Sequence, residues 1–243
     1  MIFLFTDYGW QGPWRGQLQA VLMERAPHRP VVDLMHDAPA FRPGASAHLL
    51  AALGASLPSG SICVGVVDPG VGTARDGVVL EADGRWFVGP DNGLLDVIAA
   101  RAQTVRWWRI DYPPEGEART FHGRDLFAPV AAMLANGEPV PGTPLVAGTL
   151  VHPGHAAGAD RAAVIYLDGF GNAATGIRAH AAAYGDLVVA GRRIPAVGTF
   201  ADLPSGEPGW LCNSLGLVEV VANQASAAEC LGLALDTEVA WAP

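Results

Sequence analysis

The chain has 243 residues, half of them hydrophobic, so it can bury the core of one large domain or of two smaller ones. Its formal charge of −9 repels phosphate backbones and argues against a nucleic-acid partner. The sequence has no uncharged apolar run of the about 18 residues that a membrane span needs, and no basic region of the kind that opens a signal peptide. Cys63, Cys212 and Cys230 suit packing thiols in a reducing compartment better than a disulfide scaffold. We therefore expect a cytoplasmic protein without a membrane partner.

The first third of the chain alternates strand and helix patterns. Short β-branched runs predict strands, and apolar residues at helical spacing that end at prolines predict helices. In chain order these are a strand at 2–5, a helix at 14–24, a strand at 31–35, a helix at 45–57 and a strand at 61–67. This order predicts an α/β fold with a mostly parallel sheet and helices on both faces.

The middle of the chain continues this pattern and then loses it. We predict a hairpin of strands at 77–81 and 85–88, helices at 94–101 and 127–135, and a further strand at 104–110. The stretch 137–158 is rich in Pro, Gly and His without periodicity, which is typical of a linker. We therefore divide the chain into an N-terminal α/β domain, residues 1–155, and a C-terminal domain, residues 156–243.

The C-terminal residues have a different sequence pattern. Several short β-type runs are separated by Gly-rich turns, which predicts a smaller β-barrel domain. The stretch 225–235 fits a short helix and a loop equally well.

Polar residues follow several of the predicted strands. Asp7, Asp68 and the pair Asp91–Asn92 each end or follow one, and the carboxyl ends of parallel strands meet at one edge of a sheet. Each of them alone is also a common turn former. Arg75 is separated from Asp68 by a tight turn and can pair with it, while His122 precedes a predicted helix. A neutral His can take the proton of a water, and an adjacent Arg can favour the hydroxide that results.

Two other motifs imitate functional sites. His152 and His155 have metal-like spacing, but a Pro-Gly pair places them in a turn without a carboxylate or Cys, so we predict no metal. Gly169–Ala174 follows a strand and imitates a dinucleotide fingerprint. Asp168 before it, Gly176 after it and the surrounding β pattern argue against that interpretation, although a dinucleotide-dependent oxidoreductase stays open as an alternative.

Taken together, the motifs resemble one family, the S-adenosyl-L-methionine (SAM) hydroxide adenosyltransferases, or adenosine-forming SAM hydrolases, which are relatives of fluorinase and chlorinase. Four ordered motifs carry the resemblance most specifically: Thr6–Gly9, Val67–Gly72 with Arg75, Gly89–Gly93, and Thr120–Pro129. It continues more loosely through Asp168–Asn172 and Asn213–Gly216.

The resemblance implies a fold, an assembly and a reaction. The fold is an α/β domain followed by a β-barrel, in a homotrimer with active sites between subunits. The reaction is hydrolysis of SAM to adenosine and L-methionine without a cofactor, through a catalytic set of Asp68, Arg75 and His122. Asp7 would hold the ribose hydroxyls, Asp168 and Ser214 the methionine end, and Asn172 the adenine; the remaining substrate-binding residues would be Tyr8, Phe170 and Asn213.

Two alternatives of other classes remain beside the hydrolase. The halogenating relatives carry an aromatic hydroxyl and a Thr where this chain has Asp68 and Val71, and they have an extra loop, so this chain favours water over halide. A protein that binds SAM or a nucleoside without turnover would need Asp7, Asn172 and Asp168, but it could discard Arg75 and His122, which this chain keeps.

Overall fold

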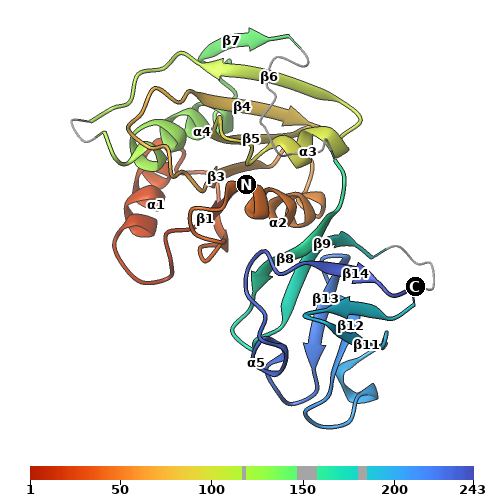
Figure 1. Ribbon diagram of the computed structural model, residues 1–243. Helices are drawn as coiled ribbons and strands as arrows, with labels where there is room; N and C mark the ends of the chain where they lie inside the picture. Colours follow the sequence, from red (N-terminus) through yellow and green to blue (C-terminus); the bar gives the residue numbers. More distant parts are fainter. Residues whose placement is uncertain (117–118, 147–157, 180–184) are drawn as a thin grey trace. The chain divides into compact units, whose positions relative to one another are not determined.

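The structure is a computed structural model that describes residues 1–116, 119–146, 158–179 and 185–243. The chain forms two compact units, Met1–Gly158 and Ala159–Pro243 (Figure 1). The boundary predicted at residue 155 and the pair His152 and His155 lie outside the described residues. No helix among the described residues is long and apolar enough to cross a membrane.

The first unit is built on a seven-stranded sheet with the order β2-β1-β3-β5-β4-β6-β7 (Figure 1). The strands β2, β1, β3 and β5 pair in parallel, whereas β4, β6 and β7 pair antiparallel with their neighbours. In chain order they are β1 Ile2–Thr6, β2 Val31–Met35, β3 Ile62–Val66, β4 Gly77–Ala82, β5 Arg85–Pro90, β6 Val105–Ile110 and β7 Gly142–Leu145. The predicted α/β class is confirmed, and the sheet is mixed because the hairpin β4–β5 reverses the chain within it.

Strand β7 lies in the stretch that the sequence assigned to a linker. Among the described residues its one partner is β6, from Trp107↔Leu145 to Ile110↔Gly142, and the strand includes Pro144. An edge strand tolerates proline because one of its sides has no ladder to join. A four-residue edge strand with Gly and Pro leaves no alternation for sequence patterns to detect.

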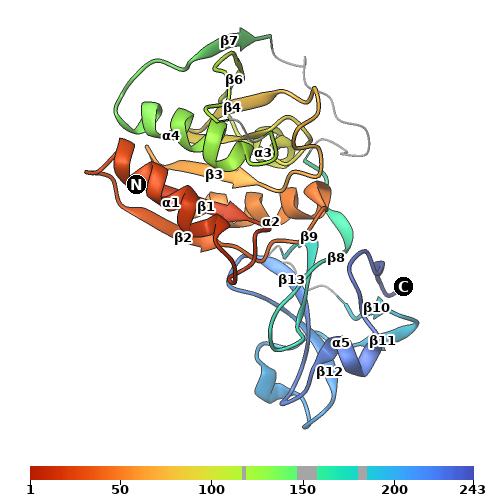
Figure 2. The ribbon, with the colours of Figure 1, turned by 90° about the vertical axis from the view of Figure 1, so that its left-hand side faces the viewer.

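Helices cover both faces of this sheet. α1 packs against α4, and α2 packs against α3 (Figure 2). Their bounds are α1 Trp14–Arg25, α2 Pro43–Ala55, α3 Asp96–Arg101 and α4 Ala128–Ala135, the last preceded by a π-helical turn, η1 Gly123–Phe127. Proline at the first position of α2 suits that place, because the amide it lacks would have no partner inside the helix.

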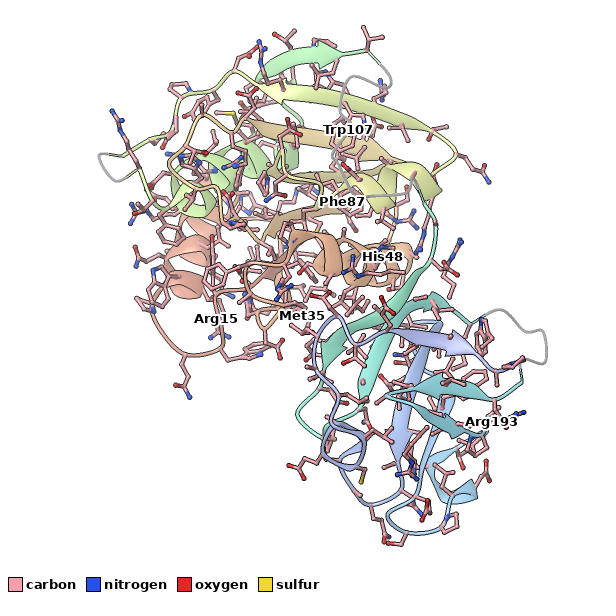
Figure 3. The ribbon with its side chains drawn as sticks, viewed as in Figure 1. Arg15, Met35, His48, Phe87, Trp107 and Arg193 are labelled. Atoms are coloured by element: carbon pink, nitrogen blue, oxygen red, sulfur yellow. The ribbon has the colours of Figure 1, made fainter. Side chains whose placement is uncertain are left out.

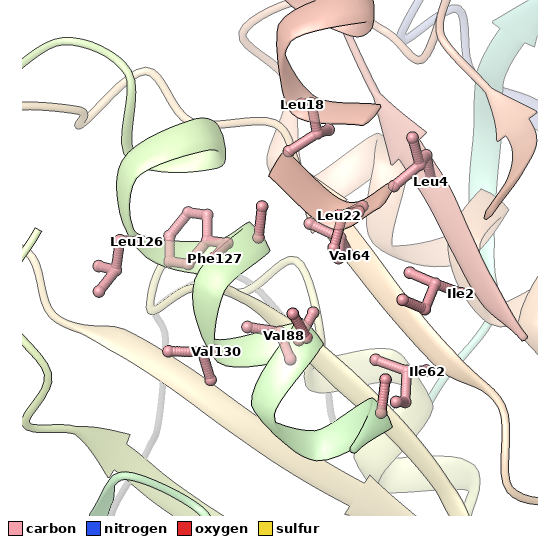
Figure 4. Close-up of a cluster of buried hydrophobic side chains, with 14 of the residues drawn as sticks. Ile2, Leu4, Leu18, Leu22, Ile62, Val64, Val88, Leu126, Phe127 and Val130 are labelled. Atoms are coloured by element: carbon pink, nitrogen blue, oxygen red, sulfur yellow. The ribbon is translucent and has the colours of Figure 1, made fainter. Parts of the chain in front are cut away.

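The core under α1 and α4 follows from the period of two along the strands. Ile2 and Leu4 of β1 face Leu18 and Leu22 of α1, all of them fully buried (Figure 4). The close-up also shows Ile62, Val64, Val88, Leu126, Phe127 and Val130 in the same cluster. Alternate residues point to the other face, where Phe87 lies beside Gly54 of α2. The first unit is therefore a three-layer α/β structure whose rigid strands place the loops at their ends.

Two strand ends determine where polar residues gather. Thr6 and Val66 are paired in the parallel register of β1 and β3, and the amide of Asp7 donates to the carbonyl of Val66 at 3.3 Å. Asp7 and Asp68 therefore emerge at the same edge of the sheet, as the sequence predicts.

The second unit consists of two antiparallel sheets, one of order β12-β13-β9-β8 and one of order β11-β10-β14. Isolated bridges Ala163↔Glu238 and Ala196↔Trp210 join the sheets along both edges, so the seven strands close into the small barrel that the sequence predicts. The strands are β8 Arg161–Leu167, β9 Ala173–Arg178, β10 Leu187–Val189, β11 Arg192–Ile194, β12 Pro208–Cys212, β13 Leu217–Ala222 and β14 Val239–Trp241. The ambiguous stretch 225–235 contains a short helix, α5 Ala227–Leu231, capped by Ser226.

The dinucleotide-like motif is a turn of this barrel. Asp168–Asn172 connects β8 to β9, which pair antiparallel. A dinucleotide fingerprint needs a strand that leads into a helix whose N-terminus holds the pyrophosphate. Here β9 follows in place of that helix, which removes the structural basis of the oxidoreductase alternative.

Candidate active site

Three side chains far apart in the sequence meet at the end of β3. Nη2 of Arg75 donates to Oδ2 of Asp68 at 2.6 Å and to Nδ1 of His122 at 3.0 Å. The side chains of Asp68 and Arg75 are 4% and 9% exposed, and His122 is buried. The structure therefore places the three predicted catalytic residues in one hydrogen-bonded set with Arg75 in the middle.

The loop that carries Asp68 and Arg75 is shaped by its own polar groups. The amide of Gly70 donates to Oδ1 of Asp68 at 3.2 Å, and the hydroxyl of Thr73 donates to the carbonyl of Gly70 at 2.7 Å. Gly72 has a φ of +81°, and a Cβ there would approach the carbonyl oxygen of Arg119 to 3.1 Å. Glycine is therefore required at the point where the loop reverses and brings Arg75 back onto Asp68.

The motif Gly89–Gly93 supports this loop through Asn92. Its Nδ2 donates to the carbonyl of Val67 at 2.9 Å, one residue before Asp68, and its Oδ1 accepts from the amide of Leu94 at 3.2 Å. Asn92 thus fastens the end of β3 to the loop after β5.

Burial and charge shift the pKa values within the catalytic set. Burial raises the pKa of Asp68, and the charges of Arg75 and His122 oppose that shift. Burial lowers the pKa of His122 from its ordinary 6.5, and the positive charge of Arg75 lowers it further. Burial also lowers the pKa of Arg75, against the pull of Asp68. His122 is consequently a neutral imidazole at neutral pH.

A pocket of about 170 Å³ opens beside this set. Asp7, Tyr8, Asp68 and His122 line it. Arg75 lies behind them and lines a neighbouring polar hollow of about 380 Å³ together with His122. The first pocket thus presents two carboxylates and an imidazole to any ligand inside it.

Tyr8 forms an apolar wall with a polar tip in this pocket. Its ring meets Phe121 edge to face, with 5.7 Å between the ring centroids. Burial raises the pKa of Tyr8, so the phenol stays protonated and can donate a hydrogen bond. A Cβ on Gly123 would overlap the Tyr8 hydroxyl oxygen, which explains why glycine begins η1 directly after His122.

Three aromatic residues of the pocket, Trp14, Phe41 and Phe121, were not predicted as site residues, although Phe121 lies within the motif Thr120–Pro129. Phe41 is 74% exposed and has a φ of +60°, and its amide donates to Oδ2 of Asp7 at 3.3 Å. A left-handed backbone at a non-glycine residue is often retained where function requires it. The sequence gives no periodic signal for Phe41, which lies in an irregular stretch, and Trp14 reads only as the start of a helix.

The second unit holds the other predicted substrate-binding residues. Oδ1 of Asp168 accepts from the amides of Phe170 and Asn172 at 2.9 and 2.8 Å, and Oδ2 accepts from Nδ2 of Asn172 at 2.9 Å. This network fixes the turn between β8 and β9. It buries Asn172 and leaves Phe170 83% exposed at the tip.

Asn213 and Ser214 lie in the turn between β12 and β13. Oδ1 of Asn213 accepts from the amides of Leu215 and Leu217, both at 3.0 Å, and Ser214 is exposed beside it. Nδ2 of Asn213 donates to Glu219 at 3.0 Å, and burial raises the pKa of that carboxyl, with Asp168 adding to the shift. Sequence analysis did not single out Glu219, because one acidic residue in a strand resembles an ordinary solvated position.

Comparisons with known proteins find relatives over nearly the whole chain. Residues 2–143 match the SAM hydroxide adenosyltransferase N-terminal domain, and residues 162–240 match the C-terminal domain of the same family. A protein named (R)-S-adenosyl-L-methionine hydrolase from Thermus thermophilus is 40% identical over 96% of this chain and 95% of its own, and one of the same name from Salinispora arenicola is 37% identical over 94% and 92%. An uncharacterized conserved protein from Thermotoga maritima superposes with a TM-score of 0.84 at 27% identity, over 98% of both chains.

The two domain matches cover the unit that holds Asp68, Arg75 and His122 and the unit that holds Asp168 and Asn213. The chain belongs to the SAM hydroxide adenosyltransferase family.

Proposed function

We propose that this protein is a hydrolase that converts SAM to adenosine and L-methionine by attack of a water-derived oxygen on C5′ of the ribose. The observation that carries the proposal is the buried Asp68–Arg75–His122 set, two members of which line a pocket together with Asp7. The names of the relatives support the same reaction. The names of these relatives specify (R)-S-adenosyl-L-methionine. The descriptor L already gives the configuration at the α-carbon of methionine, so we assign (R) to the sulfonium centre. We extend the proposal to SAM with that configuration at sulfur.

The proposed reaction balances without an oxidant, a reductant or a cofactor. An O–C5′ bond forms, the C5′–S bond breaks with its electron pair going to sulfur, and the water gives up one proton. The cationic sulfonium becomes a neutral thioether as the anionic nucleophile adds, so charge is lost on the way to products. Such a step gains from a site that excludes water.

The direction of the hydrogen bonds assigns the proton steps. Arg75 can only donate, so Nδ1 of His122 accepts and the neutral ring carries its proton on Nε2. His122 then serves as a donor to the attacking oxygen. We assign the water proton to Asp68, which lines the same pocket and whose raised pKa makes it a stronger base. The sequence-based expectation gave that proton to His122, and these roles replace it.

The remaining residues are proposed to hold the substrate. Asp7 takes the ribose hydroxyls, with Tyr8 beside it in the pocket. From the second unit, Asp168 and Ser214 take the methionine end and Asn172 takes the adenine, with Phe170 and Asn213 in the same two turns.

We also propose a cytoplasmic homotrimer with active sites between subunits. Large apolar side chains on both units, among them Trp10, Phe41 and Phe170, are exposed in the single chain, which favours their burial by a neighbouring subunit. Sedimentation equilibrium should give three times the chain mass of 25.3 kDa. A monomer at micromolar concentration contradicts the assembly and leaves the chemistry untouched.

The test of the reaction is product analysis. Incubation with SAM should give adenosine and L-methionine in equal amounts. Added chloride or fluoride should not divert the product, because the Asp68 carboxylate repels an anion in the pocket. A 5′-halogenated nucleoside would support the halogenase alternative, and binding without products would support a binding protein.

Replacement of Asp7 should impair binding more than turnover. In Asp7→Ala we expect KM for SAM and Kd for adenosine to rise about 10- to 100-fold, because hydrogen bonds to a charged group are worth about 1.5–3 kcal/mol. The contact exists in the ground state as well as the transition state, so kcat should fall less. Adenosine calorimetry and steady-state kinetics check this, with Asp7→Asn as the control that keeps one acceptor. Unchanged adenosine affinity would remove Asp7 from the site.

The pH dependence should follow His122 and Asp68, because protonation of Asp68, whose pKa is raised by burial, also removes the proposed base. The pKa of His122 is lowered below 6.5, and its protonation would put a second positive charge against Arg75 and force Nδ1 to become a donor. Activity should therefore be lost as pH falls through a value below 6.5 and should be level at neutral pH. A profile of kcat/KM from pH 4 to 9 measures this, and an acid limb centred above 7 contradicts the assignment.

A further inference from the structure

A second set of hydrogen-bonded residues lies behind Asp7, on the side away from the catalytic set. Oγ1 of Thr6 lies 2.8 Å from Nδ1 of His36, and Nε2 of His36 lies 2.9 Å from Oδ1 of Asp33. Thr6 and His36 are both fully buried. The order hydroxyl, imidazole, carboxylate is the one that activates a nucleophile in hydrolytic triads, but this hydroxyl cannot reach a ligand, so a nucleophilic role is excluded.

The His36 ring joins the two ends of this set. The carboxylate of Asp33 can only accept, so Nε2 of His36 donates to it, and Nδ1 of the same ring shares a hydrogen bond with the Thr6 hydroxyl. Oγ1 of Thr6 in turn accepts from the amide of Tyr8 at 3.3 Å. Thr6 and His36 therefore each take part in two hydrogen bonds, and the set reaches the main chain on both sides of Asp7.

Main-chain contacts reinforce the same place. The amide of Gly9 donates to the carbonyl of His36 at 2.6 Å, and the amide of Ala38 donates to the carbonyl of Thr6 at 3.1 Å. The segment 6–9 is thus tied to 36–38 by main chain as well as side chain. Asp7 lies in the middle of this clamped segment.

The other end of the set is fastened to α1. Oδ1 of Asp33 also accepts from Gln19 at 2.7 Å, and Oδ2 accepts from Arg15 at 3.3 Å. Arg15, labelled in Figure 3, projects from the first turn of α1. Its guanidinium stacks over Trp10, which meets the His36 ring edge to face.

We propose that Thr6, His36 and Asp33 are positioning residues that hold the Asp7 carboxylate in place for the ribose diol, and that they determine substrate affinity with little effect on turnover. The proposal rests on the role proposed above for Asp7. The three residues touch neither substrate nor the reacting atoms, because Thr6 and His36 are closed off from solvent and Asp33 lies beyond them.

A pair of variants at Thr6 tests this. Thr6→Val keeps the shape and removes the hydroxyl, whereas Thr6→Ser keeps the hydroxyl. We expect Thr6→Val to raise KM for SAM and Kd for adenosine in parallel by about tenfold, which corresponds to about 1.4 kcal/mol, with kcat within about threefold of wild type. The Thr6→Ser variant should have KM and Kd values close to those of wild type. Glu24→Gln, an exposed change on α1, should alter neither.

Asp33→Asn gives a second variant if Thr6→Val does not fold, because Asp33 lies at the partly exposed end of the set. It should raise both constants in the same direction by a smaller factor. A folded Thr6→Val or Asp33→Asn protein that has a lowered Tm and wild-type Kd and KM would overturn the proposal, since that is the signature of a purely structural role. A wild-type protein that binds adenosine but releases none from SAM contradicts the hydrolase and still leaves adenosine calorimetry as a valid test of these residues.

Discussion

Asp68→Asn should abolish most of the turnover while leaving the pocket intact. The substitution is isosteric, and the amide can neither take a proton from water nor carry the charge that holds Arg75 in place. We expect kcat for SAM to fall by about 10²- to 10⁴-fold, the range that general-base catalysis contributes. KM should change by less than about threefold, because Asp68 is proposed to stabilise the transition state, in which the hydroxide forms, and not the bound substrate.

The comparison that isolates this effect is Glu138→Gln, which removes one negative charge from an exposed position of the same unit. It should retain wild-type kcat, so that a fall in Asp68→Asn cannot be assigned to net charge. An Asp68→Asn protein that binds adenosine normally and keeps kcat within tenfold of wild type would show that Asp68 is not the base.

Arg75→Lys should cause the second largest loss. Lysine preserves the positive charge but lacks the planar fork with which one Nη2 serves both Asp68 and His122. We expect kcat to fall about 100-fold, since the loss of one preorganised donor in an active site costs about 10²- to 10³-fold. Arg75→Ala is a poorer test, because it leaves the buried Asp68 carboxylate unpaired, which costs about 3–5 kcal/mol of folding stability.

Single-turnover kinetics separates the chemical step from binding in Arg75→Lys. Arg29→Lys, at an exposed position, is the matched control and should behave as wild type. If Arg75→Lys instead raises KM with kcat unchanged, Arg75 binds substrate and does not support the nucleophile.

Local patterns predict where Asp68 and Arg75 lie, whereas the family resemblance supplies their proposed catalytic roles and that of His122. Asp7 and Asp68 follow short apolar runs that predict strands, and parallel strands bring such residues to one edge. Arg75 is separated from Asp68 by a glycine-rich turn that has few ways to close. His122 was found through its motif, and its place next to Arg75 depends on packing that joins residues 47 positions apart.

The parts that the sequence does not predict depend on tertiary contacts without a pattern. Thr6 and His36 are separated by 30 residues, and nothing near either one indicates the other. Phe41 became a pocket residue through a left-handed backbone that no propensity favours for phenylalanine. The role proposed for His122 also differs from the sequence-based expectation, because only the structure shows that Arg75 lies within hydrogen-bond distance of its Nδ1.

The most direct test of the account follows the oxygen atom. When SAM is incubated with the protein in oxygen-18 water and the products are analysed by mass spectrometry, the label should appear in the 5′-hydroxyl of adenosine, with unlabelled L-methionine as the other product. The Asp68→Asn protein should form the same labelled adenosine at a rate lower by about 10²-fold or more. Adenosine without the label, or cleavage at a bond other than C5′–S, would contradict attack by water at C5′ and with it the roles assigned to Asp68, Arg75 and His122.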